Sequence, residues 1–436
     1  MKLLTVIVGV VSVLGAQTAS RACLNDIDSD TLANQAKGLP DVVRVITGRF
    51  ERNPPLFYQM RVARVQNELK ANPSRLPLYD DIAVALDRLG RDDEAIAWMK
   101  WKKAQLDKAN RSNGAARKEV KEQLYRYYAN QGTFIAHRWL RAGASRAKLA
   151  EMKQARDYIA EAIRLKPNAH FGLEKYQLMA MEWILAPHGS AVEKSGYHDN
   201  FSLSSYLWYE FDDPASGTYY KRADRTTYQP PDKRKVEGLS GLIVLGNAWE
   251  SIDIFDALAQ ALDTLEIKSR NGQGFTVNKA VTLQCLANLR IQELIKKGRR
   301  PLFATTATQE KLLLQWGRCN GLYRENAQAV ESLYHRLRQE AEEWQTRRTA
   351  FMTARLKTGR HPDTDPKFWN GWIDNAPPSL ETREHWITYS DLERENNKLV
   401  KQRVFWLKAF VGGALLLLTA LITLLVLRRK RRIRTN

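Results

Sequence analysis

The residues of this chain that could do chemistry are dispersed and form few patterns of known function. The sequence has no HExxH, GxSxG or GxxxxGK[ST] pattern and no paired-cysteine metal motif, and its 7 histidines are scattered. His361, Asp363 and Asp365 lie two residues apart, and calcium sites use hard oxygen ligands at this spacing. The further carboxylate that such a site needs is missing, and Asp beside Pro is common in turns. We therefore predict no catalytic residues, no metal site and no cofactor.

The 3 cysteines allow one disulfide. Cys285 and Cys319 both lie in stretches with helical periodicity, and an oxidising compartment would permit them to pair. Two buried free thiols are the alternative.

An aromatic-rich insertion is expected between residues 187 and 240. This stretch is dense in Gly, Pro, Ser and Asp, which favour loops, and its many aromatic residues indicate that it is ordered. It could be a lid that buries its own rings or a contact surface, because Tyr and Trp dominate binding hot spots. The contact surface would use Tyr206, Trp208, Tyr209 and Phe211.

A second function class follows from the same insertion. Its rings could stack on a sugar, with Asp212 or Asp213 close by, in a carbohydrate-binding or hydrolytic ectodomain.

The two ends of the chain indicate export and a membrane anchor. Residues 1–22 have the order of a signal peptide, with cleavage after Ala22. Residues 409–427 are about 19 apolar residues, enough to span a bilayer as a transmembrane helix. Residues 428–436 form a basic tail. We expect a single-pass protein of the plasma (inner) membrane, with its N-terminus in the periplasm or cell exterior and its C-terminus in the cytoplasm.

An alternative for the C-terminal segment is a sorting signal that is removed after export. Gly412-Gly413, the apolar run and the arginine cluster have the three-part form of such signals.

The charge balance does not point to nucleic acid. Lys and Arg number 68 against 48 Asp and Glu, a net charge of +20. The basic tail sits where anionic lipid would attract it, and the remaining excess forms no basic stripe or RNA-binding motif.

Helical periodicity dominates the ectodomain, so the fold class is mostly α. Two stretches carry small and apolar residues at the spacing of helical hairpins. The first places Tyr79, Ile82, Ala83 and Leu86 before Gly90, and Ala95 and Met99 after it; the second is Ala155, Ile159, Ala162 and Pro167. These stretches resemble degenerate tetratricopeptide repeats (TPR). Lys102 and Asp107 depart from the pattern, since a small residue and a proline are expected there.

The resemblance implies a TPR-like helical-hairpin solenoid over residues 23–186, with further hairpins over 241–320. In TPR proteins a peptide usually lies against the first helix of each pair. Carried onto the best-matched repeat, this implies an exposed binding face of Asp80, Val84, Asp87 and Arg88.

A long amphipathic helix is expected over residues 321–358. Apolar residues recur in steps of three and four from Tyr323 to Phe351, missing only at Arg348. This seam over 323–351 could pack on the chain's own repeats or form a homodimer. A loop and a juxtamembrane helix follow over 359–408. The sequence thus predicts a membrane-anchored scaffold that binds other proteins and is not an enzyme.

Overall fold

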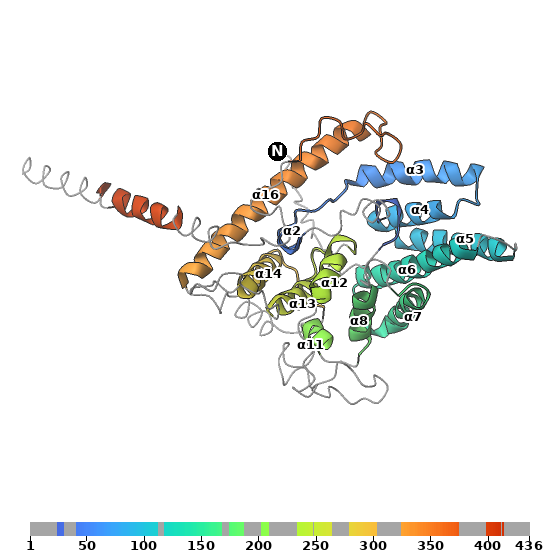
Figure 1. Ribbon diagram of the computed structural model, residues 1–436, viewed down its shortest axis with the longest axis horizontal. Helices are drawn as coiled ribbons and strands as arrows, with labels where there is room; N and C mark the ends of the chain where they lie inside the picture. The colour runs from blue at the N-terminus through green and yellow to red at the C-terminus, as the bar shows by residue number, and fades with distance from the viewer. Residues whose placement is uncertain are drawn as a thin grey trace, which may run out of the picture.

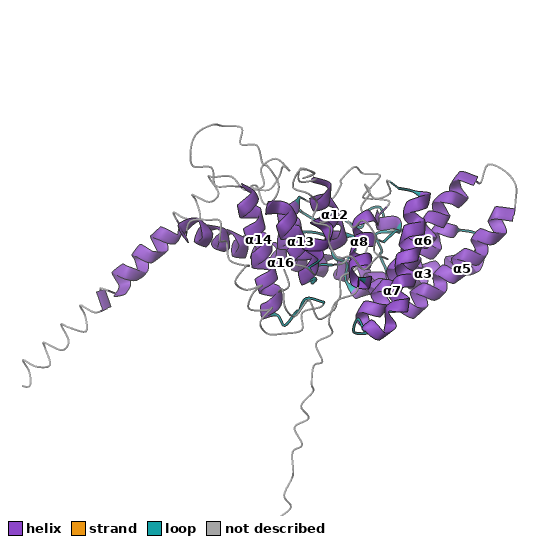
Figure 2. Cartoon of the chain, turned by 90° about the horizontal axis from the view of Figure 1, so that it is seen from below, coloured by secondary structure: helices purple, strands orange, loops and turns teal. Residues whose placement is uncertain are grey.

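The computed structural model describes residues 24–29, 41–111, 117–167, 174–186, 202–208, 233–246, 248–263, 279–302, 324–374, 398–410 and 412–413. In these ranges the regular secondary structure is helical, and Figure 2 shows helices joined by loops without a strand. The prediction of a mostly α fold is confirmed. The expected signal peptide and basic tail, together with most of the insertion and of the apolar C-terminal run, lie outside the described residues.

The first half of the molecule is a stack of antiparallel helices (Figure 1). Each helix packs against the one before it, and α4 also contacts α6. The members are α3 (Pro55–Ala71), α4 (Leu76–Arg88), α5 (Asp92–Arg111), α6 (Arg117–Arg141), α7 (Leu149–Leu165) and α8 (Glu174–Leu185).

Glycines set the geometry of this stack at two points. Gly90 ends α4 with φ +76°, and the N–H groups of Gly90 and Arg91 close the helix on the carbonyls of Asp87 and Leu86. Gly132 lies where α6 crosses α7, and a Cβ there would be 2.8 Å from the carbonyl oxygen of Ala155. The turn therefore needs a left-handed residue, and the crossing needs a residue without a side chain.

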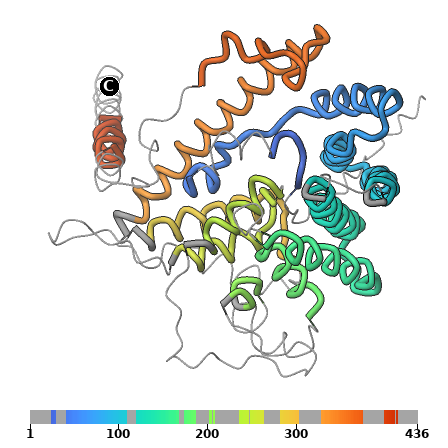
Figure 3. Tube along the Cα trace, turned by 45° about the vertical axis from the view of Figure 1, so that its right-hand side comes forward, coloured from blue at the N-terminus to red at the C-terminus, as the bar shows by residue number. Residues whose placement is uncertain are grey.

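A second group of helices packs beside α8. It consists of α2 (Val42–Thr47), α11 (Leu203–Trp208), α12 (Lys233–Val244), α13 (Ile252–Asp263) and α14 (Lys279–Lys296). α13 contacts α11, α12 and α14, while α8 contacts α11 and α12. α2 belongs to this second group although it precedes the stack in the sequence, since it lies against α12 and α14 (Figure 3). The chain therefore passes from the second group into the stack between α2 and α3.

α16 (Arg324–Leu356) joins the two groups. It contacts α14 and α2 in the second group and α3 in the stack (Figure 1). Its apolar face is buried within the chain, through Val330, Tyr334, Leu337, Ala341 and Trp344. Its last turns pack Met352 and Leu356 against Phe57 and Phe368.

Arg348, where the heptad seam is interrupted, is also buried. Its guanidinium donates to the backbone carbonyl of Arg52, to Asn53 and to Glu51, so the interruption is a docking point for the segment that leads into α3. The apolar seam is thus covered by its own chain. A homodimer through residues 323–351 would have to use the opposite, charged face, and it stays an untested prediction.

Residues 398–410 form a helix that projects from the rest of the molecule (Figure 1). Phe405, Trp406 and Phe410 are 65%, 70% and 75% exposed. Among the helices of the described residues, none has both the length and the apolar character required to cross a bilayer. The transmembrane helix expected over 409–427 falls largely outside those residues.

Candidate functional site

The expected peptide-binding face of α4 begins with Asp80, which the structure places in the interior of the stack. Its Oδ2 lies 2.5 Å from the Nζ of Lys102 on α5, and its Oδ1 accepts a hydrogen bond from the side-chain amide of Asn130 on α6. Asp80 and Lys102 are both 0% exposed. Burial raises the pKa of Asp80 and lowers that of Lys102, and the attraction between the two charges opposes both shifts.

The other end of the same face is buried as well. An oxygen of Asp87 lies 2.6 Å from Nδ1 of His137 and 3.1 Å from a guanidinium nitrogen of Arg141, both on α6. Val84 is 1% exposed. Arg88 is partly exposed and donates to the carbonyl of Leu245, which ties α4 to the second helix group.

The expectation of an open binding face is therefore wrong for Asp80, Val84 and Asp87. The physical reason is that the carboxylates of Asp80 and Asp87 contact cationic or amide groups on neighbouring helices. These groups take the place of the water that would hydrate an exposed carboxylate.

What lies on this side of α4 and α6 is the chain's own N-terminal segment (residues 24–29). The side-chain amide of Asn130 holds the backbone of Asn25 at two points, accepting from its N–H at 2.8 Å and donating to its C=O at 2.9 Å. Asp81 of α4 accepts a hydrogen bond from the N–H of Ile27 at 2.9 Å. These hydrogen bonds are made with backbone groups of the segment, and they come from two helices of the stack, α4 and α6.

Arg61 of α3 secures the same segment through its charges. Its guanidinium contacts Asp26 at 3.4 Å, Asp28 at 2.9 Å and Asp363 at 2.7 Å. Burial alone would lower the pKa of Arg61, but Asp28 and Asp363 outweigh it and raise that pKa. One buried cation thus joins the N-terminal segment, α3 and the loop after α16.

Two carboxyl groups at this contact ionise at a higher pH than usual. Burial, followed by repulsion from Asp28, raises the pKa of Asp26 to about 6. Burial, followed by repulsion from Asp26, raises the pKa of Asp81 to about 7. The docking of the segment is consequently sensitive to protons near neutrality.

The HPDTDP sequence belongs to this contact and not to a cation site. Asp363 accepts from Arg61 and Arg64, and Asp365 accepts from Arg360. The ring of His361 stacks on Phe57 at 4.6 Å. Arginine therefore occupies the carboxylate oxygens that a calcium ion would need. Within the described ranges, no group of three or more His, Cys, Asp or Glu residues is arranged to hold a metal ion.

The structure describes only part of the aromatic insertion. Tyr206 lies on α11, is buried and hydrogen-bonds to Glu182 of α8. The side chain of Trp208 and the residues Tyr209, Phe211, Asp212 and Asp213 lie outside the described part. The insertion as a contact surface, and its carboxylates as sugar ligands, stay predictions.

Cys285 is buried on α14 and is disulfide-bonded. Cys319, the partner expected from the sequence, lies outside the described residues, so the pairing itself stays a prediction.

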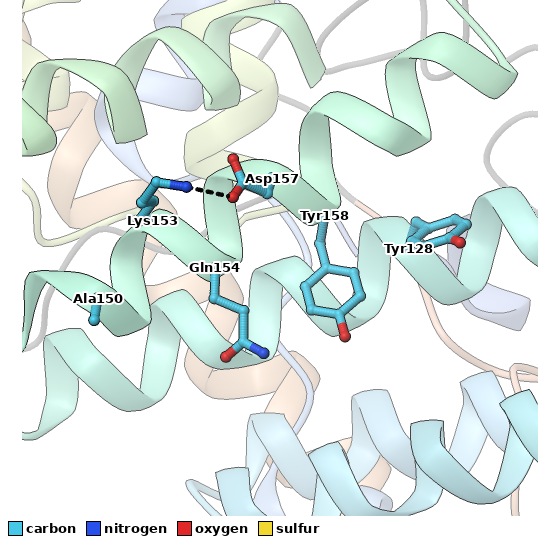
Figure 4. A pocket seen from close by; sticks show the side chains of 6 residues that line it. All are labelled: Tyr128, Ala150, Lys153, Gln154, Asp157 and Tyr158. Atoms are coloured by element: carbon cyan, nitrogen blue, oxygen red, sulfur yellow. Dashed lines mark hydrogen bonds and ion pairs between the residues drawn. The ribbon is translucent and has the colours of Figure 1, made fainter.

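An open groove lies along α7 and was not found from the sequence. It has a volume of about 410 Å³ and is lined by Tyr128 of α6 and by Ala150, Lys153, Gln154, Asp157 and Tyr158 of α7. Figure 4 shows the two tyrosine rings at one end, Ala150 at the other, and the Lys153–Asp157 ion pair, at 3.0 Å, between them. The rings of Tyr128 and Tyr158 are 5.9 Å apart and inclined by 38°.

These groups can bind a ligand in two ways. The rings offer rigid apolar faces, and the amide and the ion pair offer hydrogen bonds. A signal for the groove was present in the sequence, since Lys153, Gln154 and Asp157 fall on the polar side of a helix whose apolar side is Ala155, Ile159 and Ala162.

No family model, no curated protein and no solved structure matches this chain. The assignment of a function therefore depends on the geometry of these surfaces.

Proposed function

We propose that the protein is a membrane-anchored, extracytoplasmic helical scaffold of the TPR-like kind that binds other proteins. The observation that carries the proposal is the groove on α7. Its two tyrosine rings lie beside exposed polar residues, a composition that is common where proteins bind one another.

The stacked helices support the same function. A rigid stack presents a groove in a constant shape, so little conformational entropy is lost when a partner binds. The N-terminal segment covers part of α4 and α6, while the α7 groove is open to a partner. Anchoring through the apolar C-terminal run would hold this surface at the membrane.

A crosslinking pull-down from intact membranes tests the proposal. Ala150→Arg with Gln154→Arg would fill the groove from exposed positions without touching the core. Arg164→Ala, an exposed position on α7 outside the groove, is the matched control. A form lacking residues 197–228 separately tests the insertion as a contact surface.

We expect the wild type and Arg164→Ala to capture the same specific proteins and the double variant to lose them. Capture that is unchanged in the double variant but lost in the deletion form would move the binding site to the insertion. Absence of specific proteins from every form would reject the scaffold.

Carbohydrate binding is a second candidate, and the same groove favours it. Tyrosine faces beside an amide and a carboxylate can stack on a sugar ring and bind its hydroxyl groups. Binding of soluble glycans by the wild type but not by the double variant, with no protein captured, would support this candidate.

A further inference from the structure

Three arginine side chains share one indole ring in the second helix group. The Cζ atoms of Arg290 (α14), Arg338 (α16) and Arg52 lie 3.7, 5.2 and 5.3 Å from the ring centre of Trp249. Arg52 belongs to the segment between α2 and α3, so three separate parts of the chain place a cation here. We refer to Arg52, Arg290, Arg338 and Trp249 as the Trp249 cluster.

The carboxylates at the Trp249 cluster do not balance its cations. Glu293 is shared by Arg290 at 2.9 Å, Arg338 at 3.2 Å and Lys297 at 2.6 Å. Glu342 contacts Arg338 at 2.5 Å. Among the described residues, two carboxylates therefore face four cations, namely Arg52, Arg290, Arg338 and Lys297, which leaves a surplus of two positive charges. The nearby Arg348 and Arg49 have carboxylates of their own, Glu51 and Asp374.

Arg52 is the member of the cluster without a counterion. In the described part of the chain its hydrogen bond is to the carbonyl of Gly48, at 3.1 Å, and no carboxylate lies within ion-pair distance. Its side chain is partly exposed, so the remaining N–H donors can be reached from solvent. Burial and the neighbouring Arg338 and Arg290 lower the pKa of Arg52 to about 10.

A buried donor beside Arg52 also has no acceptor. Nε of Arg290 is enclosed and makes no hydrogen bond to any described residue. Stacking on Trp249 and the hydrogen bond to Gly48 stabilise Arg52. As a third cation without a carboxylate, however, it is repelled by the other two arginines, since like charges repel.

We propose that the Trp249 cluster binds a phosphate group, with Arg52 as its principal contact. The planar guanidinium fork matches two phosphate oxygens, and a phosphate dianion would neutralise the surplus of two positive charges. A carboxylate would neutralise half of it. Free phosphate, a soluble phosphate monoester and a lipid whose headgroup is a phosphate monoester share this chemistry.

Calorimetric titration of the full chain in neutral detergent with inorganic phosphate tests the site, with sodium chloride at equal ionic strength as the reference. Arg52→Gln removes the fork, and Arg52→Lys keeps the charge without the fork. Arg347→Gln removes an exposed charge from α16, away from Trp249, and is the matched control.

We expect inorganic phosphate to bind the wild type and Arg347→Gln. Arg52→Gln should raise the dissociation constant at least about tenfold. Arg52→Lys is expected to lie between them, because a point charge replaces the fork. Phosphatidylcholine vesicles with and without phosphatidic acid, whose headgroup is a phosphate monoester, identify the source: binding to the anionic vesicles that depends on Arg52 supports the site and assigns it to lipid.

Thermal unfolding separates this role from a structural one. Without phosphate, Arg52→Gln is expected to keep or raise the midpoint, since it removes a cation from cationic surroundings, and to abolish the rise that phosphate gives the wild type. A lowered midpoint in Arg52→Gln, together with no effect of phosphate or anionic vesicles on the wild type, would overturn the proposal. If Arg52→Gln fails to fold, affinity for phosphate in Arg52→Lys equal to that of the wild type would also overturn it.

Discussion

Lys102 shows how a single residue can depart from a repeat pattern for a structural reason. TPR-like spacing expects a small residue at this position, and the structure buries a lysine there against Asp80. Asn130 completes the contact from a third helix. An ion pair between α4 and α5 thus stands where a tetratricopeptide-like pair would have small residues in close contact.

Replacing Lys102 by Met should destabilise the protein by about 3–5 kcal/mol, because Asp80 would be left buried without its partner and would have to stay ionised or take up a proton. Urea unfolding of the full chain in detergent measures this loss. Lys103→Ala is the control, since Lys103 makes an exposed pair with Asp107 and should cost below about 1 kcal/mol. Equal losses in Lys102→Met and Lys103→Ala would show that the buried pair has no special role.

The sequence could not predict that the charged residues of α4 are internal. Their spacing is that of any solvated helix face, and burial depends on Lys102, Asn130 and His137, which lie 22 to 50 residues away along the chain. Leu, Ile and Ala positions were predictable because apolar residues have a single favourable environment. Buried ion pairs look like exposed charges until their partners are known.

Among the elements, the N-terminal segment has the clearest dependence on pH. The pKa values of Asp26 and Asp81, about 6 and about 7, are above the usual 3.8. The folded state therefore holds protons that the unfolded state has released, so stability is greatest at the acidic end and falls as pH rises toward 7. Above about pH 5, Asp363, whose pKa is held below its usual range, is ionised in both states and does not contribute. Burial lowers the pKa of His361, which opposes the fall, but one such group acts against two carboxyl groups.

We expect the free energy of unfolding to decrease between pH 5 and 7.5, by up to a few kcal/mol. Asp81→Asn keeps an acceptor for the N–H of Ile27 but carries no charge, so its decrease should be smaller. Urea titrations of both proteins at several pH values measure the difference. A wild-type curve that is flat, or that rises with pH, would contradict the direction.

The crossing of α6 and α7 gives a prediction about packing. Ala at position 132 would gain about 1 kcal/mol of helix propensity over Gly. Its Cβ would, however, lie 2.8 Å from the carbonyl oxygen of Ala155 and 3.0 Å from Ile159, and a backbone carbonyl in a helix cannot move away. The clash should win, with a net loss of about 1–2 kcal/mol for Gly132→Ala and a larger loss for Gly132→Ser.

Thermal unfolding of the two variants checks this order. A rise in midpoint for Gly132→Ala would mean that propensity outweighs the contact.

Helix positions in this region could be predicted from periodicity, and the close approach could be anticipated from small residues in α7. The identity of the glycine that permits it required the structure.

At the scale of the whole molecule, the helix that carries the exposed rings of Phe405, Trp406 and Phe410 is followed in the sequence by the apolar residues 411–427. Lipid would cover these surfaces, and nothing in the described core depends on them. If this run is the proposed membrane anchor, removal of residues 409–436 should move the protein from the membrane to the soluble fraction with its unfolding midpoint unchanged. Removal of residues 428–436 alone should leave it in the membrane, because basic residues add only about 1 kcal/mol each at an anionic surface.

Fractionation of cells that produce the three forms measures this outcome. A form lacking residues 409–436 that still sediments with membranes would contradict the anchor. Intact mass of the longest form separates a retained anchor from a processed sorting signal, since processing removes the basic tail.

The contact at Arg61 also affects the order in which the chain folds. Asp363 lies 302 positions beyond Arg61, and Thr47 receives a hydrogen bond from Arg338, 291 positions away. Contacts of such sequence separation form slowly, because a long loop must close before they stabilise anything. These residues are synthesised long before their partners and are thus among the last to be secured. During that interval the buried face of α3 and the apolar seam of α16 are open to solvent, where they can associate with other unfolded chains.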